Sequence, residues 1–253
     1  MTKEIIYAVN VTLDAYSVLI SLIIAGSIFL FKKKDKPVKW FVYTNIAAVL
    51  YGISDIIMWI SEGTDAKWKL IALPVSSFIF FFVGILVFVC YIGYIISYYR
   101  KTSEISNKYF YCCVGLAAVY ILCLIISQFM DNGFYYITEQ NTYVRGKLFN
   151  ITIYIEVCMY VEAILLIFKF HKNVQSFENI GFASFIFVPF ICHIIQLANF
   201  GIALTSVGLA ISFFIIYLNL NHKMQQEIEE AKSKLDEKTE ETEDSEETEN
   251  YSD

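Results

Sequence analysis

Several apolar runs in this sequence are longer than 18 residues and carry few charges or none. A run of that length can cross the hydrocarbon core of a bilayer as a single helix. The composition agrees, because 57% of the 253 residues are hydrophobic and only 17% are charged, whereas soluble domains carry about 25% charged residues. The sequence therefore predicts an all-α fold, a polytopic bundle of membrane-spanning helices.

Seven spans can be placed along the chain. They cover about residues 13–31, 38–60, 70–98, 109–130, 148–170, 180–197 and 201–220. The first run ends at a lysine cluster rather than at a cleavage site, so we expect it to be retained as a span. The predicted organisation is a seven-helix transmembrane domain over 1–221, a cytoplasmic helical extension over 222–238 and a disordered acidic tail over 239–253.

The lysines and arginines beside the spans predict how the bundle is oriented. An odd number of spans places the two termini on opposite sides of the membrane. Eleven cations flank the spans on the side of the C-terminus and five on the other side. Because cytoplasmic loops are enriched in Lys and Arg, the N-terminus is expected outside and the C-terminus in the cytoplasm. We expect a multi-pass protein of a cell membrane, and the preference for Lys over Arg suggests a bacterial source.

The last span continues into a charged helix without an intervening Gly or Pro. Residues spaced alternately by four and three form a heptad pattern, typical of a coiled coil. These expected signal-output positions are Tyr217, Asn221, Met224, Ile228, Ala231 and Leu235. One interpretation is a helix that transmits motion to the cytoplasm and pairs in a homodimer. The alternative is a solvated extension with no partner, since the pattern covers few heptads.

Ionisable residues inside the spans are candidate functional groups, because their burial in a membrane is unfavourable. With a helical rise of about 1.5 Å per residue, Glu156 and His193 fall at a similar depth in the outer half of the bundle. The predicted ligand-binding residues are Asp55, Trp59, Tyr143, Arg145, Glu156, His193 and Gln196. The alternative is that Glu156 and His193 only join two helices. Asp14 is expected at the outer interface, as a helix cap.

Several function classes are disfavoured by what the sequence lacks. The last span has no Lys for a retinal Schiff base, and there is no HExxH, GxSxG or P-loop motif. The three histidines show no metal-ligand spacing, and no basic patch suggests a nucleic-acid partner. We therefore predict neither an enzyme nor a cofactor or metal site. The six cysteines all lie within predicted spans, where a disulfide framework is not expected.

Three segments together resemble a known arrangement: residues 52–59 (GISDIIMW), residues 143–149 (YVRGKLF) and the stretch from Ile195 to Leu220. They are similar to the N-terminal multi-span sensor region of Gram-positive bacterial diguanylate cyclases and of some histidine kinases. The resemblance covers about residues 5–230 and implies a last span that drives a cytoplasmic GGDEF or kinase domain, usually in a dimer. Here an acidic tail follows Leu235 in place of that domain, so no enzymatic activity is transferred.

These observations predict a membrane sensor that binds a small or lipid-like ligand in the outer half of the bundle. It would signal through the seventh span to a separate cytoplasmic partner, such as a kinase or cyclase. One alternative is a transporter or channel subunit with a polar path through Asp55, Glu156, Glu162 and His193. Another is a structural membrane protein whose polar groups only join helices.

Overall fold

The computed structural model describes residues 3–30, 35–198 and 202–250, and side chains in the last helix as far as Lys234. Seven long helices occur in these ranges, each long and apolar enough to cross a membrane. They are α1 (Lys3–Phe29), α2 (Lys36–Ser61), α3 (Lys69–Tyr99), α4 (Lys108–Ser127), α5 (Phe149–Phe170), α6 (Ser176–Ala198) and α7 (Thr205–Asn250). The prediction of an all-α, seven-helix polytopic bundle is confirmed.

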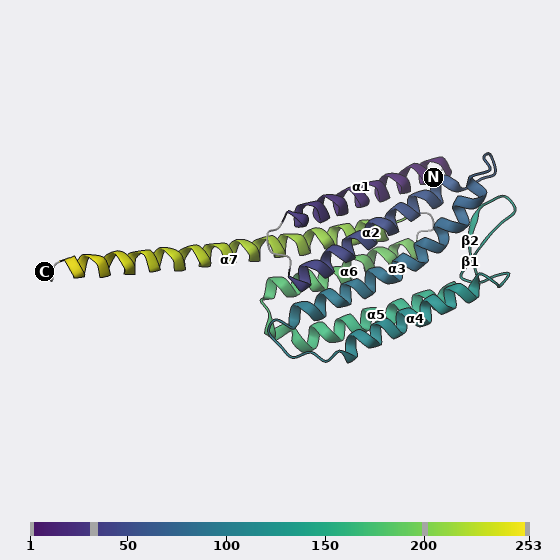
Figure 1. The fold of residues 1–253 in the computed structure, drawn as a ribbon. Helices are drawn as coiled ribbons and strands as arrows, with labels where there is room; N and C mark the ends of the chain where they lie inside the picture. Colours follow the sequence, from purple (N-terminus) through teal and green to yellow (C-terminus); the bar gives the residue numbers. More distant parts are fainter. Residues whose placement is uncertain (1–2, 31–34, 199–201, 251–253) are drawn as a thin grey trace. The chain divides into compact units, whose positions relative to one another are not determined.

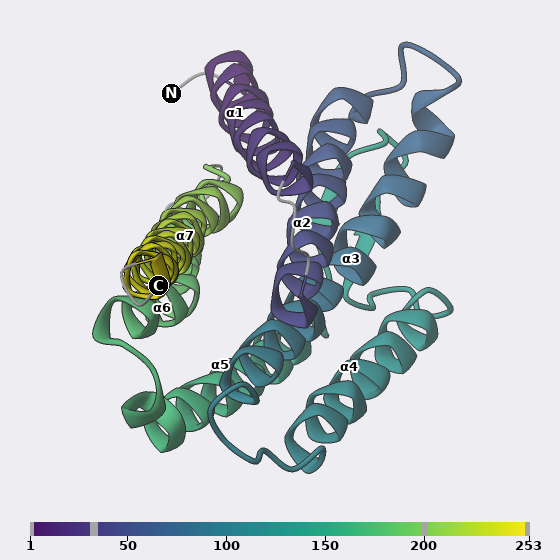
Figure 2. The same ribbon diagram turned by 60° about the vertical axis from the view of Figure 1, so that its left-hand side comes forward.

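The chain divides into two compact units, Met1–Ile215 and Ile216–Asp253. Within the first unit α1 lies beside α2, and α4 lies beside α5 (Figures 1 and 2). The 3₁₀ helix η1 (His171–Asn173) connects α5 to α6. α2 begins at a side-chain cap, because Asp35 Oδ1 accepts a hydrogen bond from the Val38 amide at 3.1 Å and Pro37 occupies the first turn.

The core of the first unit is built around α3, whose last two turns are buried on nearly all sides. Aromatic side chains fill it. The ring of Tyr91 stacks on Phe185 of α6 at 3.6 Å between centroids, and its hydroxyl donates to the Phe182 carbonyl at 2.5 Å. Buried tyrosines satisfy their hydroxyl in this way while the ring packs among apolar groups. These contacts fix α6 against α3.

α6 and α7 approach each other closely at a glycine. A Cβ added to Gly208 would lie 2.9 Å from Pro189 Cα and 3.0 Å from Cys192 Sγ. One turn further along α7, the Ser212 hydroxyl donates to the Ser184 carbonyl at 2.9 Å. Small residues allow such packing between membrane helices, and the hydroxyl adds an interhelical hydrogen bond. The start of α7 is thereby held against the middle of α6.

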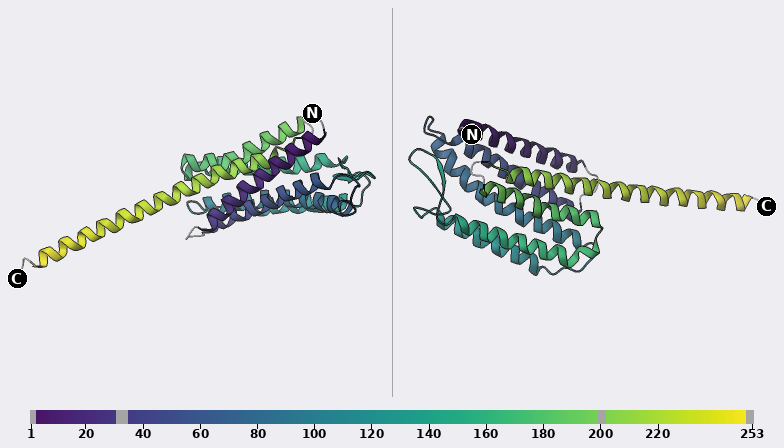
Figure 3. Two further views of the ribbon diagram at one scale, coloured as in Figure 1. Left: turned by 90° about the horizontal axis from the view of Figure 1, so that it is seen from above. Right: turned by 180° about the vertical axis from the view of Figure 1, so that it is seen from behind.

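The connection between α4 and α5 contains a β-hairpin that the sequence did not lead us to expect. β1 (Tyr135–Ile137) and β2 (Tyr143–Arg145) pair antiparallel, with Tyr135 opposite Arg145. The hairpin lies at the end of the bundle where α2 and α4 end and α3 and α5 begin (Figure 3).

Asn141 holds the tip of the hairpin on α2. Its φ of 52° lies in the left-handed region, which Asn tolerates better than most residues. Its Nδ2 donates to the carbonyls of Ser61 at 2.7 Å and Gly63 at 2.8 Å. These carbonyls lie at the C-terminus of α2, where the helix itself supplies no donor. The hairpin thus depends on a helix distant in sequence.

The base of the hairpin requires glycine. A Cβ added to Gly146 would lie 2.0 Å from the Gly133 carbonyl oxygen, so the two backbones could not approach as they do. Beside them, the Tyr135 hydroxyl donates to Gln128 Oε1 at 3.0 Å. Burial raises the pKa of Tyr135 to about 12, so this hydroxyl remains a donor at neutral pH.

The helix α7 extends through Asn250 and therefore includes the predicted extension over 222–238. It also includes residues 239–250, where the sequence led us to expect a disordered tail. The segment has no Gly or Pro, and six of its twelve residues are Glu, a good helix former. Among the heptad positions, the Ile228 side chain is 60% exposed within the second unit. The side chain of Leu235 lies outside the described residues.

Candidate functional site

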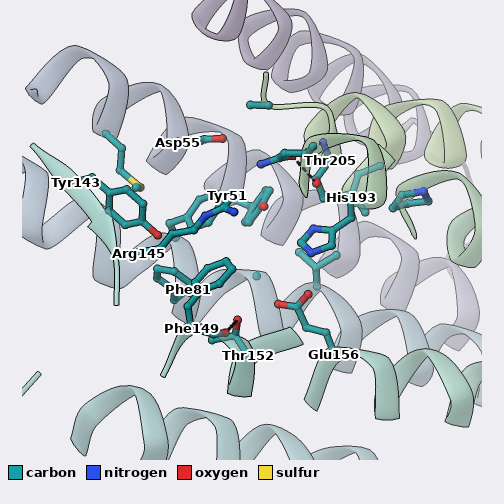
Figure 4. A pocket seen from close by; sticks show the side chains of 18 of the residues that line it. Tyr51, Asp55, Phe81, Tyr143, Arg145, Phe149, Thr152, Glu156, His193 and Thr205 are labelled. Atoms are coloured by element: carbon teal, nitrogen blue, oxygen red, sulfur yellow. Dashed lines mark hydrogen bonds between the residues drawn. The ribbon is translucent and has the colours of Figure 1, made fainter. Parts of the chain in front are cut away.

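One cavity lies within the first unit, in the half of the bundle that carries the hairpin, and encloses about 220 Å³. That volume suits a small organic molecule, since a water in the liquid occupies about 30 Å³. All seven residues predicted to bind ligand line it, and five of them are labelled in Figure 4. They are Asp55 and Trp59 from α2, Tyr143 and Arg145 from β2, Glu156 from α5, and His193 and Gln196 from α6.

Aromatic rings make up much of the remaining wall, and sequence reasoning did not single them out. They are Tyr51, Phe80, Phe81, Phe88, Tyr120, Phe149 and Tyr160. Tyr51 of α2 stacks on Phe80 of α3 with 4.4 Å between ring centroids. The run of phenylalanines at residues 78–82 was the available signal, but a span rich in Phe is equally typical of lipid-facing surfaces.

The hairpin supplies the cation of the cavity. Tyr143 and Arg145 are two residues apart on β2, and alternate residues of a strand share a face. The Arg145 guanidinium lies 4.7 Å from the centre of the Phe149 ring and extends among the lining side chains (Figure 4). Burial raises the pKa of Tyr143, although the nearby guanidinium acts in the opposite direction. The Tyr143 hydroxyl is therefore neutral and available as a donor.

Glu156 and His193 point toward one another across the cavity, from α5 and α6 (Figure 4). The Nε2 atom of His193 is buried and has no hydrogen-bond partner among the described residues. An unsatisfied buried nitrogen is unfavourable by about 1–3 kcal/mol, so a ligand that hydrogen-bonds to it would gain that difference. The pair is thus arranged to receive a polar group placed between its members.

Gln196 has a structural role as well as a place in the wall. Its Oε1 accepts hydrogen bonds from the Leu204 amide at 3.1 Å, the Thr205 amide at 3.3 Å and the Thr205 hydroxyl at 2.9 Å. The first amides of a helix have no partner within the helix, and Gln196 supplies one from α6. Its carbonyl oxygen is therefore engaged with α7 rather than turned to a ligand.

Asp14 does not lie at the interface as a cap, which corrects the expectation from sequence. Its side chain is 0% exposed, and its carboxyl group contacts that of Asp55. No pattern in the sequence indicates this contact, because it depends on how α1 pairs with α2. By contrast Glu162, a member of the polar path that a transporter would use, is not among the residues that line the cavity.

The cavity has an acidic excess. Its charged lining residues are Asp55, Glu62 and Glu156 against Arg145, with His193 as a further titratable group. Within the described ranges, no group of three His, Cys, Asp or Glu side chains is placed to hold a metal ion. The charged, polar and aromatic side chains of the lining can form ion pairs, hydrogen bonds and ring contacts.

Comparison of the sequence with protein-family models finds no match, and a search among curated proteins finds no relative.

Proposed function

We propose that this protein is a membrane receptor that binds a small organic cation in its cavity and signals through α7. The observation that carries the proposal is the convergence of acidic, hydrogen-bonding and aromatic side chains from seven elements on one cavity. Binding sites for small molecules commonly combine an apolar wall with a few converging polar groups.

The lining supports a cationic ligand with an apolar body. Carboxylates outnumber cations in the wall, and aromatic faces attract an ammonium group by about 0.5–2 kcal/mol each. The ammonium group would lie near Glu156, and the body would pack among the phenylalanine and tyrosine rings. Arg145 and Tyr143 would hydrogen-bond to any polar group at the other end of the ligand.

The start of α7 supports a route for the signal. Thr205 and Leu209, in the first two turns of α7, line the cavity, and Thr205 is also bound to Gln196 of α6. A ligand in the cavity would therefore contact the helix that extends to Asn250. A shift of that helix would reach a cytoplasmic partner, and a kinase or cyclase is the class that the sequence resemblance suggests.

Three matched probes test the proposal: phenethylamine, phenethyl alcohol and phenylacetate, which share a ring and differ in the charge of the head group. The melting temperature of the purified protein in nanodiscs would be measured with each at neutral pH. Stabilisation follows RT ln(1 + [L]/Kd), about 1.4 kcal/mol at ten times Kd. We expect the amine to stabilise most and phenylacetate least, and Glu156→Gln to weaken the effect of the amine.

The matched control is Glu162→Gln, a buried carboxyl on the same helix that does not line the cavity. It should leave the effect of the amine unchanged. Equal or greater stabilisation by phenylacetate would contradict a cationic ligand. No stabilisation by any of the three would count against a binding cavity for molecules of this size.

A further inference from the structure

Asp14 is a buried carboxyl without a conventional hydrogen-bond partner. Its side chain is 0% exposed, and neither carboxyl oxygen accepts a hydrogen bond from any described residue. An ionised carboxylate in that position would lack water and would have only the Ser206 hydroxyl near it as a donor, which is unfavourable by several kcal/mol. A proton on the group, shared with a neighbouring acceptor, would remove much of that cost.

A second carboxyl lies beside that of Asp14. Asp55 of α2 is 9% exposed, lines the ligand cavity and contacts the Asp14 carboxyl of α1. Gly52, one turn before Asp55, allows this approach. A Cβ added there would lie 2.7 Å from Val18 Cγ2 and 3.9 Å from the Asp14 carbonyl oxygen. The two helices are thus packed closely at the level of the acids.

The groups around the pair supply little positive charge. The hydroxyl of Ser206 faces Asp14 from α7. Tyr51 of α2 and Tyr143 of β2 lie near Asp55, as does the indole of Trp59. In the adjoining cavity lie Arg145 and Glu156, one of each sign.

The geometry points to a proton-binding site in which Asp14 and Asp55 share one proton. Two ionised carboxylates in contact would repel each other, and both are only acceptors. With one proton, one carboxyl donates a hydrogen bond to the other, which satisfies both and leaves the pair with a single negative charge. Paired carboxyls that share a proton are an established arrangement in protein sites.

The site joins three elements and adjoins the cavity. Asp55 faces the cavity, Asp14 lies behind it on α1, and Ser206 belongs to the first turn of α7. Loss or gain of the proton would change the charge beside the cavity and the contact between α1 and α2. The shared proton does not depend on the nature of the ligand, so it can be tested on the protein without one.

Infrared spectroscopy of the full chain in nanodiscs tests the site, because a protonated carboxylic acid has a carbonyl stretch separate from that of a carboxylate. Asp14→Asn and Asp55→Asn should each remove one protonated-carboxyl band at neutral pH. The double variant should remove the same single band and no more, because the two residues hold one proton between them. Glu162→Gln is the control, and any loss it causes should add to the loss in Asp14→Asn.

Two results would overturn the proposal. A spectrum unchanged in both single variants and in the double variant would mean that the pair is ionised. A loss in the double variant twice that of each single variant would mean two separate protons.

A measurement on the wild-type chain does not depend on whether any variant folds. With ¹³C-labelled aspartate, Asp14 and Asp55 are the only aspartates within the described spans. A carboxyl in water is ionised at neutral pH. We expect one labelled band of a protonated acid with the intensity of one proton per chain, and its absence would also refute the site.

Discussion

Polar residues in the cavity act together with a partner on another helix. Glu156 and His193 are polar side chains in apolar spans, and each would be unfavourable alone. The fold turns them toward one another across the cavity (Figure 4). Two such groups should stabilise the bundle jointly, and this makes their energetic coupling measurable.

We predict that Glu156→Gln and His193→Ala are non-additive in the free energy of unfolding. Residues in one polar network couple by about 0.5–3 kcal/mol, whereas independent sites add. The free energies of the single and double variants would be measured by denaturant titration in mixed micelles. The control cycle combines Glu162→Gln with His193→Ala and should be additive. Strict additivity in the first cycle would mean that the two side chains do not interact.

At the scale of elements, α7 belongs both to the cavity and to the charged extension. Its first turns line the cavity, and it is helical from Thr205 to Asn250. The extension carries an apolar residue at most heptad positions, and a lone Asn such as Asn221 typically fixes the register of a coiled coil. The exposed side chain of Ile228 is the kind of surface that pairing with a second copy would bury.

We predict that the extension pairs in parallel in the membrane-embedded protein. Single cysteines from Met224 to Leu235 would be introduced into a chain without its six native cysteines and tested for crosslinking in membranes. Crosslinking should peak at Met224, Ile228, Ala231 and Leu235, because heptad positions face the partner. The positions between these four serve as controls. A flat profile would indicate a monomeric helix.

At the scale of the whole molecule, the orientation in the membrane decides which side of the cell the cavity serves. The cavity lies in the half of the bundle that carries the hairpin, with Tyr143 and Arg145 in its wall. If the hairpin is outside, ligands reach the cavity from the environment. The distribution of eleven and five flanking cations favours this orientation.

We predict that a reporter fused after Asp253 reads as cytoplasmic and that one inserted beside Asn141 reads as external. The measurement is a pair of alkaline phosphatase and green fluorescent protein fusions at each site, since each reporter is active on only one side. Two fusion sites on the same side would contradict an odd number of spans. Opposite sides in the reverse sense would place the cavity toward the cytoplasm.

Sequence alone was enough to predict seven helices long and apolar enough to cross a membrane, and to predict which of their polar groups share a level. Hydrophobic length is a local property, and depth follows from the rise of a helix, so Glu156 and His193 could be assigned to one level. The same reasoning selected Asp55, whereas Arg145 was expected to reach the site from the loop before the fifth span, and all four line the cavity.

Which helices pair, and therefore which side chains meet, could be seen only in the folded structure. Asp14 and Asp55 are far apart in sequence, and their contact depends on the close approach of α1 and α2 at Gly52. The hairpin depends equally on its surroundings, because two three-residue strands are stable only where Asn141 can bind the end of α2. Pairing between distant segments is set by complementary surfaces and backbone groups, which leave no periodic pattern in the sequence.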